Sequence, residues 1–370
     1  MTPPDRGPHS QEKPPRHGAR DLPSVRVDAY NAELHDPAGQ GFLGDRASNR
    51  AFVEMLEDWR VRVRRGTEGG GDPLDDALGG RRPTREIDRD ELDALLLAAE
   101  GDAEASGLVQ SAVEDFAQEM AAVVRRFLRL PAWEGTERIA VGGGFLEGKV
   151  GRMAVGRVGV LLKAGSEAVR MTPVSRHPDE AALCGAAHLA PPEALRGHDA
   201  VLAVDVGGTN LRAGLVALGL GEADDLSRAR AVATERWRHA EERPSRDAAL
   251  ARLLEMLGGL ASRAAEEGLS VAPFVGVGCP GVILADGTIE RGGQNLPGGG
   301  WEGRSFNLLS RLRDGLPAVL GQHPLVVMHN DAVVQGLSEA PAMRDVERWG
   351  VLTIGTGLGN ARFSNRRSAV

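Results

Sequence analysis

Two glycine-rich stretches could each hold a phosphate group, and the first follows the apolar run 201–204. It consists of Asp205 and, after one valine, Gly207, Gly208, Thr209 and Asn210, before a second apolar run. Adjacent glycines let backbone amides approach an anion closely, and Thr209 and Asn210 add side-chain donors. The stretch therefore fits a nucleotide phosphate, with an ordinary hairpin turn as the alternative.

The second stretch repeats this pattern near the end of the sequence. Gly355, Thr356 and Gly357 lie between the apolar run 351–354 and a second strand-like segment, 358–363. Two such loops could grip a polyphosphate from opposite sides. Neither has the Gly-Lys-Ser/Thr ending of a P-loop, and the chain has only three lysines, which argues against a Walker-type NTPase.

A candidate general base stands between the two glycine stretches. The apolar run 326–328 leads through His329 to Asn330 and Asp331, before a helix-like run. An aspartate beside a phosphate cradle can accept the proton of a substrate hydroxyl as that oxygen attacks a γ-phosphoryl group. Asn330 or Asp331 could instead simply cap the helix that follows. In the polar loop 291–301, Asn295 can donate to and accept from the hydroxyls of a polyol, although a plain Gly/Pro turn is the alternative.

To act together, these residues must be held at one edge of a β-sheet. The alternation of strand-like and helix-like segments predicts an α/β fold that could do so. Runs typical of strands occur at 25–30, 138–142, 201–205, 274–277, 325–328 and 351–354, and helical periodicity at 92–96, 108–128 and 245–265. Several strands end in Asp, Asn or Gly, and ligands gather at the carboxyl ends of strands in such sheets. The glycine triplet 142–144 lacks the spacing of a dinucleotide fingerprint, so Gly143 and Gly144 fit better as a close backbone approach to a nucleoside.

Composition excludes several classes of protein. The 370 residues are 42% hydrophobic, enough for the cores of two domains, and no apolar run is long enough to cross a membrane. The net charge of −8 and the 4% aromatic content argue against nucleic-acid binding. Two cysteines cannot build a disulfide framework, so we expect a cytoplasmic protein. Residues 1–23 are polar and Pro-rich, which predicts a disordered tail, and residues 66–84 are Gly-rich, which predicts a surface loop.

Five ordered motifs over Asp205–Gly359 together resemble the ROK family of sugar kinases and repressors, within the actin-like ATPase superfamily. They are DVGGTNLRAGLV from Asp205, GCPG from Gly278, GGQNLPGGGW from Gly292, HNDAVVQGLSE from His329 and TIGTGLG from Thr353. The resemblance implies a two-lobed α/β fold with the ligand cleft between the lobes. It also implies a glucokinase-like enzyme that uses ATP and Mg²⁺ to phosphorylate a hexose.

The resemblance assigns roles to residues of this chain. It implies Asp331 as the general base on the sugar hydroxyl and Asp205 near Mg²⁺. It implies Asn295 and Asn330 as sugar ligands, with Gly293 in the same sugar loop, and the two glycine stretches as the phosphate loops. It further suggests a homodimer.

The remaining parts of the family pattern precede Asp205 instead of following Gly359. They are Glu100-Gly101-Asp102, Ile139–Gly144 and Asp179–Ala187. We therefore infer a circular permutation, with the old termini joined through 188–200 and the new ones opened after the second glycine hairpin. This predicts a larger lobe of residues 24–197 plus 341–370, on the nucleotide and dimerisation side, and a smaller lobe of residues 198–340.

One family motif is incomplete. Many ROK proteins have a Glu-x-Gly-His sugar motif followed by a Cys-rich zinc loop, whereas this chain has Ala32-Glu33-Leu34-His35 and no such loop. We expect Glu33 and His35 to replace those sugar ligands, and we expect no zinc. A sugar sensor without turnover and an actin-like ATPase acting on a protein partner are the alternatives. A DNA-binding repressor is disfavoured because no basic helix-turn-helix precedes the core.

Overall fold

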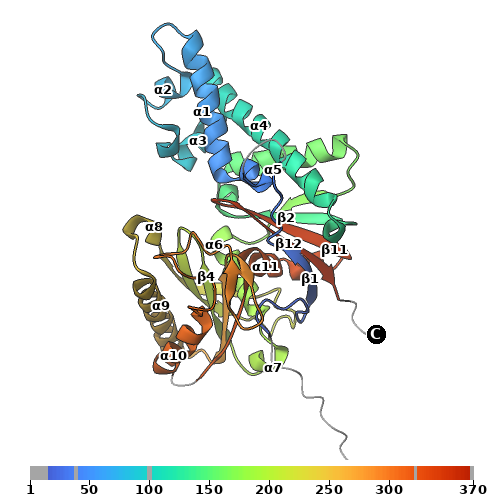
Figure 1. Cartoon of the computed structure of the whole chain (residues 1–370), viewed down its shortest axis with the longest axis vertical. Helices are drawn as coiled ribbons and strands as arrows, with labels where there is room; N and C mark the ends of the chain where they lie inside the picture. Colours follow the sequence, from blue (N-terminus) through green and yellow to red (C-terminus); the bar gives the residue numbers. More distant parts are fainter. Residues whose placement is uncertain (1–15, 37–40, 98–101, 321–322, 367–370) are drawn as a thin grey trace, which may run out of the picture.

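The computed structural model describes residues 16–36, 41–97, 102–320 and 323–366, and contains two five-stranded sheets with helices packed against them (Figure 1). Sheet A has the strand order β1-β12-β11-β2-β3, and sheet B has the order β10-β7-β4-β5-β6. A separate hairpin-like sheet joins β8 (Val282–Ile283) to β9 (Ile289–Arg291). The predicted α/β class is confirmed.

Sheet A draws its strands from distant parts of the chain. They are β1 (Val25–Tyr30), β2 (Arg138–Gly142), β3 (Arg170–Pro173), β11 (Arg348–Ile354) and β12 (Leu358–Asn365). β12 pairs antiparallel with both β1 and β11, whereas β2 runs parallel to β11 and β3. The hairpin β11–β12 therefore forms the middle of the sheet, with the second glycine stretch at its turn.

Helices from the first half of the chain stack on one another beyond sheet A, with α5 in contact with β3, in the upper part of Figure 1. They are α1 (Asn49–Gly66), α2 (Pro73–Ala77), α3 (Arg89–Leu97), α4 (Ala103–Leu128) and α5 (Lys149–Ala164). Asp102 caps α4 by accepting the backbone N–H groups of Glu104 and Ala105. The apolar stripe of α4 packs into one core with α1, α5 and the strands β2 and β11. In the described ranges, no helix has both the length and the apolar character that a membrane span requires.

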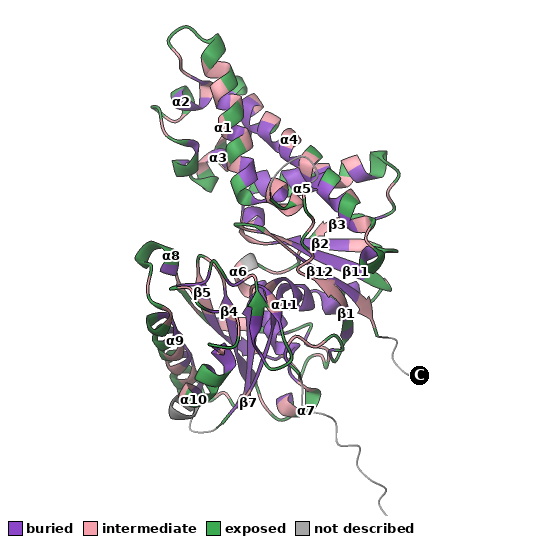
Figure 2. Ribbon diagram, viewed as in Figure 1, coloured by how far each residue is buried: buried purple, intermediate pink, exposed green. Residues whose placement is uncertain are grey.

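Sheet B has helices on both faces. Its strands are β4 (Ala200–Val206), β5 (Leu211–Ala217), β6 (Arg230–Trp237), β7 (Val271–Cys279) and β10 (Leu325–Asn330). One face carries α9 (Arg246–Glu266) and α10 (Leu308–Leu320). The short helix α7 (Pro192–Leu195) contacts β7, and α8 (His239–Glu242) follows β6 in the chain. On the other face lie α6 (Pro178–Ala187) and α11 (Asp331–Leu337), and α11 also contacts β11 and β12 of sheet A. These two helices form the buried layer between the sheets (Figure 2).

The two sheets have the same topology. In sheet B the hairpin β4–β5 is followed by β6, antiparallel beside β5, and then by β7 and β10, parallel on the β4 side. Sheet A repeats this with the hairpin β11–β12, then β1 beside β12, and β2 and β3 on the β11 side. The five strands of sheet B are consecutive in the chain, apart from the small β8–β9 sheet. In sheet A, by contrast, β1, β2 and β3 precede their own hairpin, β11–β12, and also precede all of sheet B in the chain.

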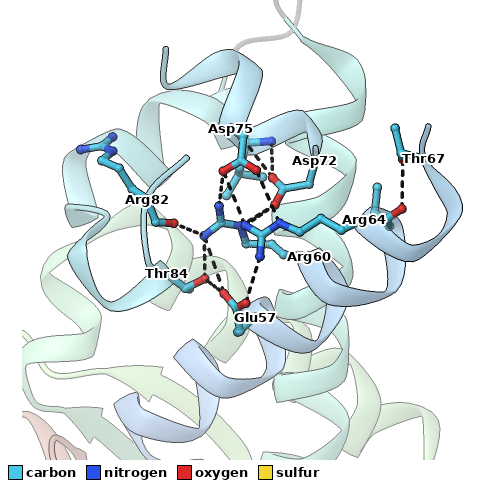
Figure 3. A network of polar contacts seen from close by, with 10 residues as sticks. Glu57, Arg60, Arg64, Thr67, Asp72, Asp75, Arg82 and Thr84 are labelled. Atoms are coloured by element: carbon cyan, nitrogen blue, oxygen red, sulfur yellow. Dashed lines mark hydrogen bonds and ion pairs between the residues drawn. The ribbon is translucent and has the colours of Figure 1, made fainter. Parts of the chain in front are cut away.

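The predicted surface loop 66–84 is wrong in part, because it contains α2 and a buried ion-pair network (Figure 3). The fully buried guanidinium of Arg60, on α1, donates to Asp72 at 2.9 Å, to Asp75 at 2.7 Å and to Thr84 at 2.8 Å. Asp72 also caps α2. The composition of residues 66–84 does not predict this network, because Arg60, which binds Asp72, Asp75 and Thr84, lies outside the glycine-rich segment.

The predicted tail 1–23 is also wrong where it is described. His17 and Leu22 are buried, and the N–H of Gly18 donates to the carbonyl of Met328 on β10 at 3.0 Å. Residues 1–15 lie outside the described ranges. A polar, Pro-rich composition predicts disorder because it cannot show that the segment forms hydrogen bonds with a strand about three hundred residues away.

Candidate active site

The carboxyl ends of three neighbouring parallel strands bring two carboxylates to one edge of sheet B. β4 lies beside β7 with Asp205 opposite Gly278, and β7 lies beside β10 with Cys279 opposite Asn330. Asp331 follows as the first residue of α11. A Cβ atom on Gly278 would lie 3.6 Å from Oδ1 of Asp205, so the glycine leaves space in front of that carboxylate.

The carboxyl group of Asp331 is the most strongly perturbed acid at this edge. Burial, and then the negative charge of Asp205, raise the pKa of Asp331 from 3.8 to about 6, against a hydrogen bond from the N–H of Ala332 to Oδ1 at 2.8 Å. The group is ionised at neutral pH and is a stronger base than an ordinary aspartate. These are the properties that a general base requires.

Asp205 belongs to a chain of alternating charges. Its Oδ2 accepts a hydrogen bond from Arg212 at 3.1 Å, and Arg212 is held in turn by Asp179 at 2.8–2.9 Å. Burial raises the pKa of the Asp205 carboxyl, and Arg212 opposes that effect. Sequence reasoning assigned no role to Asp179, which lies 33 residues from Arg212 and meets it only because α6 packs on β5.

The first glycine stretch forms the turn between β4 and β5. Its backbone is a hairpin, as the alternative expected, because the N–H of Gly207 donates to the carbonyl of Asn210 at 2.9 Å. The side-chain Oδ1 of Asn210 is nevertheless buried without a hydrogen-bond partner among the described residues. A buried polar atom of this kind requires a ligand or a water molecule. The turn therefore contains a hydrogen-bond acceptor, Oδ1 of Asn210, that is free to bind a ligand or a water molecule.

The polar loop 291–301 packs against this turn. A Cβ atom on Gly208 would lie 3.1 Å from the Cβ of Asn295, whose side chain is exposed. The N–H of Gly293 donates to Glu302 at 2.7 Å, and the buried indole of Trp301 donates to the carbonyl of Pro297 at 2.7 Å. These bonds anchor the loop and leave the Asn295 side chain, not the Gly293 amide, beside the first glycine turn.

Asn330 caps the helix that follows it. Its side chain accepts the N–H groups of Ala332 and Val333 and donates to the carbonyl of Gly281 at 3.0 Å, and the residue is only 2% exposed. These bonds use the amide oxygen twice and one of the two N–H donors of the amide nitrogen. The structure thus confirms the helix cap, which was the alternative raised from the sequence, and the sugar contact stays a prediction.

The second glycine stretch, 355–357, forms the turn between β11 and β12 and lies close to the helix that begins with Asp331. The carbonyl of Gly355 accepts the N–H of Asn49 at the start of α1, at 3.0 Å. Two residues beyond the turn, a Cβ atom on Gly359 would lie 3.2 Å from the Cβ of Ala332. Helix α11 thus links the second glycine hairpin to the edge of sheet B that carries Asp331 and Asp205.

Gly143 and Gly144 lead into a small cavity. A Cβ atom on Gly143, which has φ +92°, would lie 2.3 Å from the carbonyl oxygen of Ile354, so close packing on β11 already requires a glycine there. Phe145 follows and lines a cavity of about 210 Å³, together with Asn49 beside the second glycine turn. Its wall is part apolar, with Phe52, Val53, Leu56, Ile87, Leu92 and Val150, and part polar, with Thr84, Arg85, Asp88 and Arg89.

Glu33 and His35 have different surroundings. Glu33 Oε2 lies 3.6 Å from Nε of Arg291, at the start of the polar loop, whereas the His35 ring contacts the Phe42 ring at a tilt, with centroids 5.3 Å apart. The structure therefore brings Glu33, but not His35, to the loop that carries Asn295. Sequence reasoning missed Asn31, whose buried Nδ2 has no hydrogen-bond partner in the described part of the chain and lies near Gly292. An asparagine directly after a strand is the signal that could have found it.

The donor set at this edge suits Mg²⁺. Over the described ranges, no cluster of three or more His, Cys, Asp and Glu side chains is placed to hold a metal ion. Mg²⁺ instead commonly binds through one or two carboxylates together with substrate phosphates and water. Asp205 fits this, because no described residue donates a hydrogen bond to its Oδ1.

No family model and no curated protein matches the chain. Among solved structures, a Listeria monocytogenes protein described as "a putative N-acetylmannosamine kinase" has 27% sequence identity and a TM-score of 0.31. A "putative sugar kinase" from Cytophaga hutchinsonii has 21% identity and a TM-score of 0.34. Each alignment covers 45% of this chain and about half of the other, 47% and 48% respectively. These neighbours are thus sugar kinases by description, similar to this chain over part of their length.

Proposed function

We propose that this protein transfers the γ-phosphoryl group of ATP to a hydroxyl group of a hexose. The observation that carries the proposal is the pair Asp205 and Asp331, set at the carboxyl ends of β4 and β10 next to a glycine hairpin from each sheet. Phosphoryl transfer needs little covalent chemistry from a protein; it needs a base, a metal ligand and backbone donors in a fixed arrangement. The proposal assigns all three to residues at this edge.

Asp331 accepts the proton of the attacking sugar hydroxyl. As the sugar oxygen forms its bond to the γ-phosphorus, the bond from that phosphorus to the bridging oxygen breaks and ADP leaves with the electron pair. The hairpin bond described above occupies the N–H of Gly207, and the N–H of Gly355 donates to the carbonyl of Gly357 at 3.0 Å. The N–H groups of the residues that follow them, Gly208 and Thr356, are the donors proposed for the phosphate oxygens.

Asp205 is the residue proposed to hold Mg²⁺, which when bound neutralises phosphate charge. Arg212 opposes the rise that burial causes in the pKa of this carboxyl and orients it through the contact at Oδ2, and Asp179 fixes Arg212. Asn295 and Glu33 are the side chains proposed to bind sugar hydroxyl groups. We propose the cavity of about 210 Å³ beside Phe145 for the nucleoside, because it combines apolar side chains with polar groups that could orient a small molecule.

The proposal includes a two-lobed actin-like fold that is circularly permuted. Its support is the shared topology of the sheets, in which β1, β2 and β3 of sheet A occupy the places that β6, β7 and β10 occupy in sheet B. In a duplicated fold these strands follow their hairpin, whereas here they precede sheet B in the chain. We propose lobes of residues 24–197 plus 341–370 and of residues 198–340, with α6 crossing to the second sheet.

The test is ADP release from Mg·ATP with a panel of hexoses and N-acetylhexosamines. Sugar-dependent release is expected for the wild type, and Asp331→Asn is expected to lower kcat by roughly 10²–10⁴-fold, since the base is lost while shape and hydrogen bonding are kept. Asp314→Asn, on the exposed face of α10, is the matched control and keeps wild-type turnover. Sugar binding without turnover in the wild type would refute the kinase and favour a sugar sensor.

A further inference from the structure

A segment of the chain that precedes β1 lies directly along the strand that ends at the proposed base. Residues 16–22, the strap, run beside β10, which is the edge strand of sheet B. Gly18 donates its N–H to the carbonyl of Met328 at 3.0 Å, and the N–H of Met328 donates to Nδ1 of His17 at 3.3 Å. The strap therefore satisfies both backbone groups that Met328 presents at the open edge.

His329 links the strap to the start of α11. Its Nε2 lies 3.1 Å from the carbonyl oxygen of Ala19, and its Nδ1 accepts the N–H of Asn330 at 2.8 Å. Burial lowers the pKa of His329 to about 4, so the ring is neutral, with one donor and one acceptor, as these two contacts require. The donor faces the strap and the acceptor faces the backbone that leads to Asp331.

The ring of His329 is also held from the side of sheet A. Tyr30, the last residue of β1, meets it edge-on with ring centroids 5.1 Å apart, and the Tyr30 hydroxyl lies 3.3 Å from both the N–H and the carbonyl of Ile283. His329 is 1% exposed. One continuous stretch, from the strap through β1, thus contacts the His329 ring from two sides, through the carbonyl of Ala19 and the ring of Tyr30.

We propose that the strap and His329 position the proposed base: the strap fixes the His329 ring, His329 fixes the backbone of Asn330, and Asn330 caps the helix that begins with Asp331. This inference rests on the proposed kinase function. His329 and Ala19 are positioning residues, because neither is argued to touch the substrate. In the proposed permuted chain, the segment before β1 supports the catalytic strand.

Gly18 offers a way to displace the strap with one methyl group. It has φ +57°, and a Cβ atom there would lie 2.1 Å from the carbonyl oxygen of Ile283, so Gly18→Ala cannot keep the strap in place. Gly268→Ala is the matched control, because Gly268 has φ +68° and nothing within 4 Å of a new Cβ. Both variants carry similar backbone strain, and only the first disturbs the strap.

The experiment measures kcat, the KM values for ATP and for the sugar, and amide hydrogen exchange at Met328 and Asn330. For Gly18→Ala we expect faster exchange at both amides, kcat lower by roughly 10–100-fold, and KM values within about twofold of wild type, because a displaced base slows the chemical step more than binding. Gly268→Ala should match wild type in all of these. His329→Gln, which keeps a donor for Ala19, should retain more kcat than His329→Leu.

The outcomes separate the two proposals. No sugar-dependent turnover in the wild type refutes the kinase function. Wild-type turnover together with faster exchange but unchanged kcat in Gly18→Ala refutes the positioning role alone. A loss of kcat in Gly18→Ala that His329→Leu does not reproduce also refutes it, because the proposed route passes through that ring.

Discussion

Replacing the proposed base with its uncharged isostere should stabilise the protein at neutral pH. Asp331 is ionised at pH 7 in a place where burial and the charge of Asp205 disfavour ionisation. The amide side chain of the Asp331→Asn variant would present an oxygen that can still accept the N–H of Ala332, without the charge. The substitution should therefore impair turnover and strengthen the fold at the same time.

The magnitude follows from the pKa of Asp331 in the two states. That pKa is about 6 in the folded protein, against 3.8 for an ordinary aspartate in the unfolded chain. The difference corresponds to a factor of about one hundred in proton affinity, or roughly 3 kcal/mol. Because the folded pKa is the higher one, this stability is fully present below pH 3.8 and is lost as pH rises through 6. Wild type should therefore lose roughly 3 kcal/mol relative to Asp331→Asn between pH 4 and pH 7.5.

Urea unfolding of both proteins at pH 4, 5, 6 and 7.5 measures this difference directly. We expect similar free energies of unfolding at pH 4 and a gap that opens between pH 4 and 6, in favour of the variant. The acid limb of wild-type kcat should fall near pH 6, where the same group is protonated. The reasoning is refuted if the variant is less stable than wild type at pH 7.5, or if the gap does not change with pH.

Two further predictions concern the fold that holds the site. Arg60→Met should lower the free energy of unfolding by roughly 3–5 kcal/mol, since it leaves buried carboxylates with fewer counter-charges; a loss below 1 kcal/mol in urea unfolding would contradict this. Gly185→Ala should destabilise by about 1–3 kcal/mol or more, because the new Cβ would lie 1.8 Å from the carbonyl oxygen of Val334 where α6 crosses α11. Its control, Gly156→Ala on the exposed face of α5, should stabilise slightly by thermal unfolding, and equal effects for the two would refute the packing argument.

The sequence was informative wherever a pattern is local. Strand β1 matches its predicted bounds, and α9 begins after the predicted cap Ser245. Period-two and period-3.6 alternation of apolar residues reflect burial of one face of an element, which each segment encodes by itself. The polar residues at the ends of β4 and β10 were likewise visible, because they stand next to those apolar runs.

The sequence was misleading or silent where a residue's role depends on a distant partner. The strap was expected to be disordered, the segment around Asp72 was expected to be a loop, and Asp179 was given no part in the site. Each is fixed by one or more long-range bonds, to Met328, to Arg60 and to Arg212 respectively.

The sequence by itself determined the α/β class and most strands and suggested Asp331 as a candidate base, since residue type and short-range periodicity suffice for these, whereas the role of Asp205 was implied only by the family resemblance. The tertiary structure decided which strands share a sheet, that Asn330 caps a helix, and that the charge of Asp205 helps to raise the pKa of Asp331. These properties depend on strand pairing between segments far apart in the chain. Burial and charge at a site follow from that pairing and not from the order of neighbouring residues.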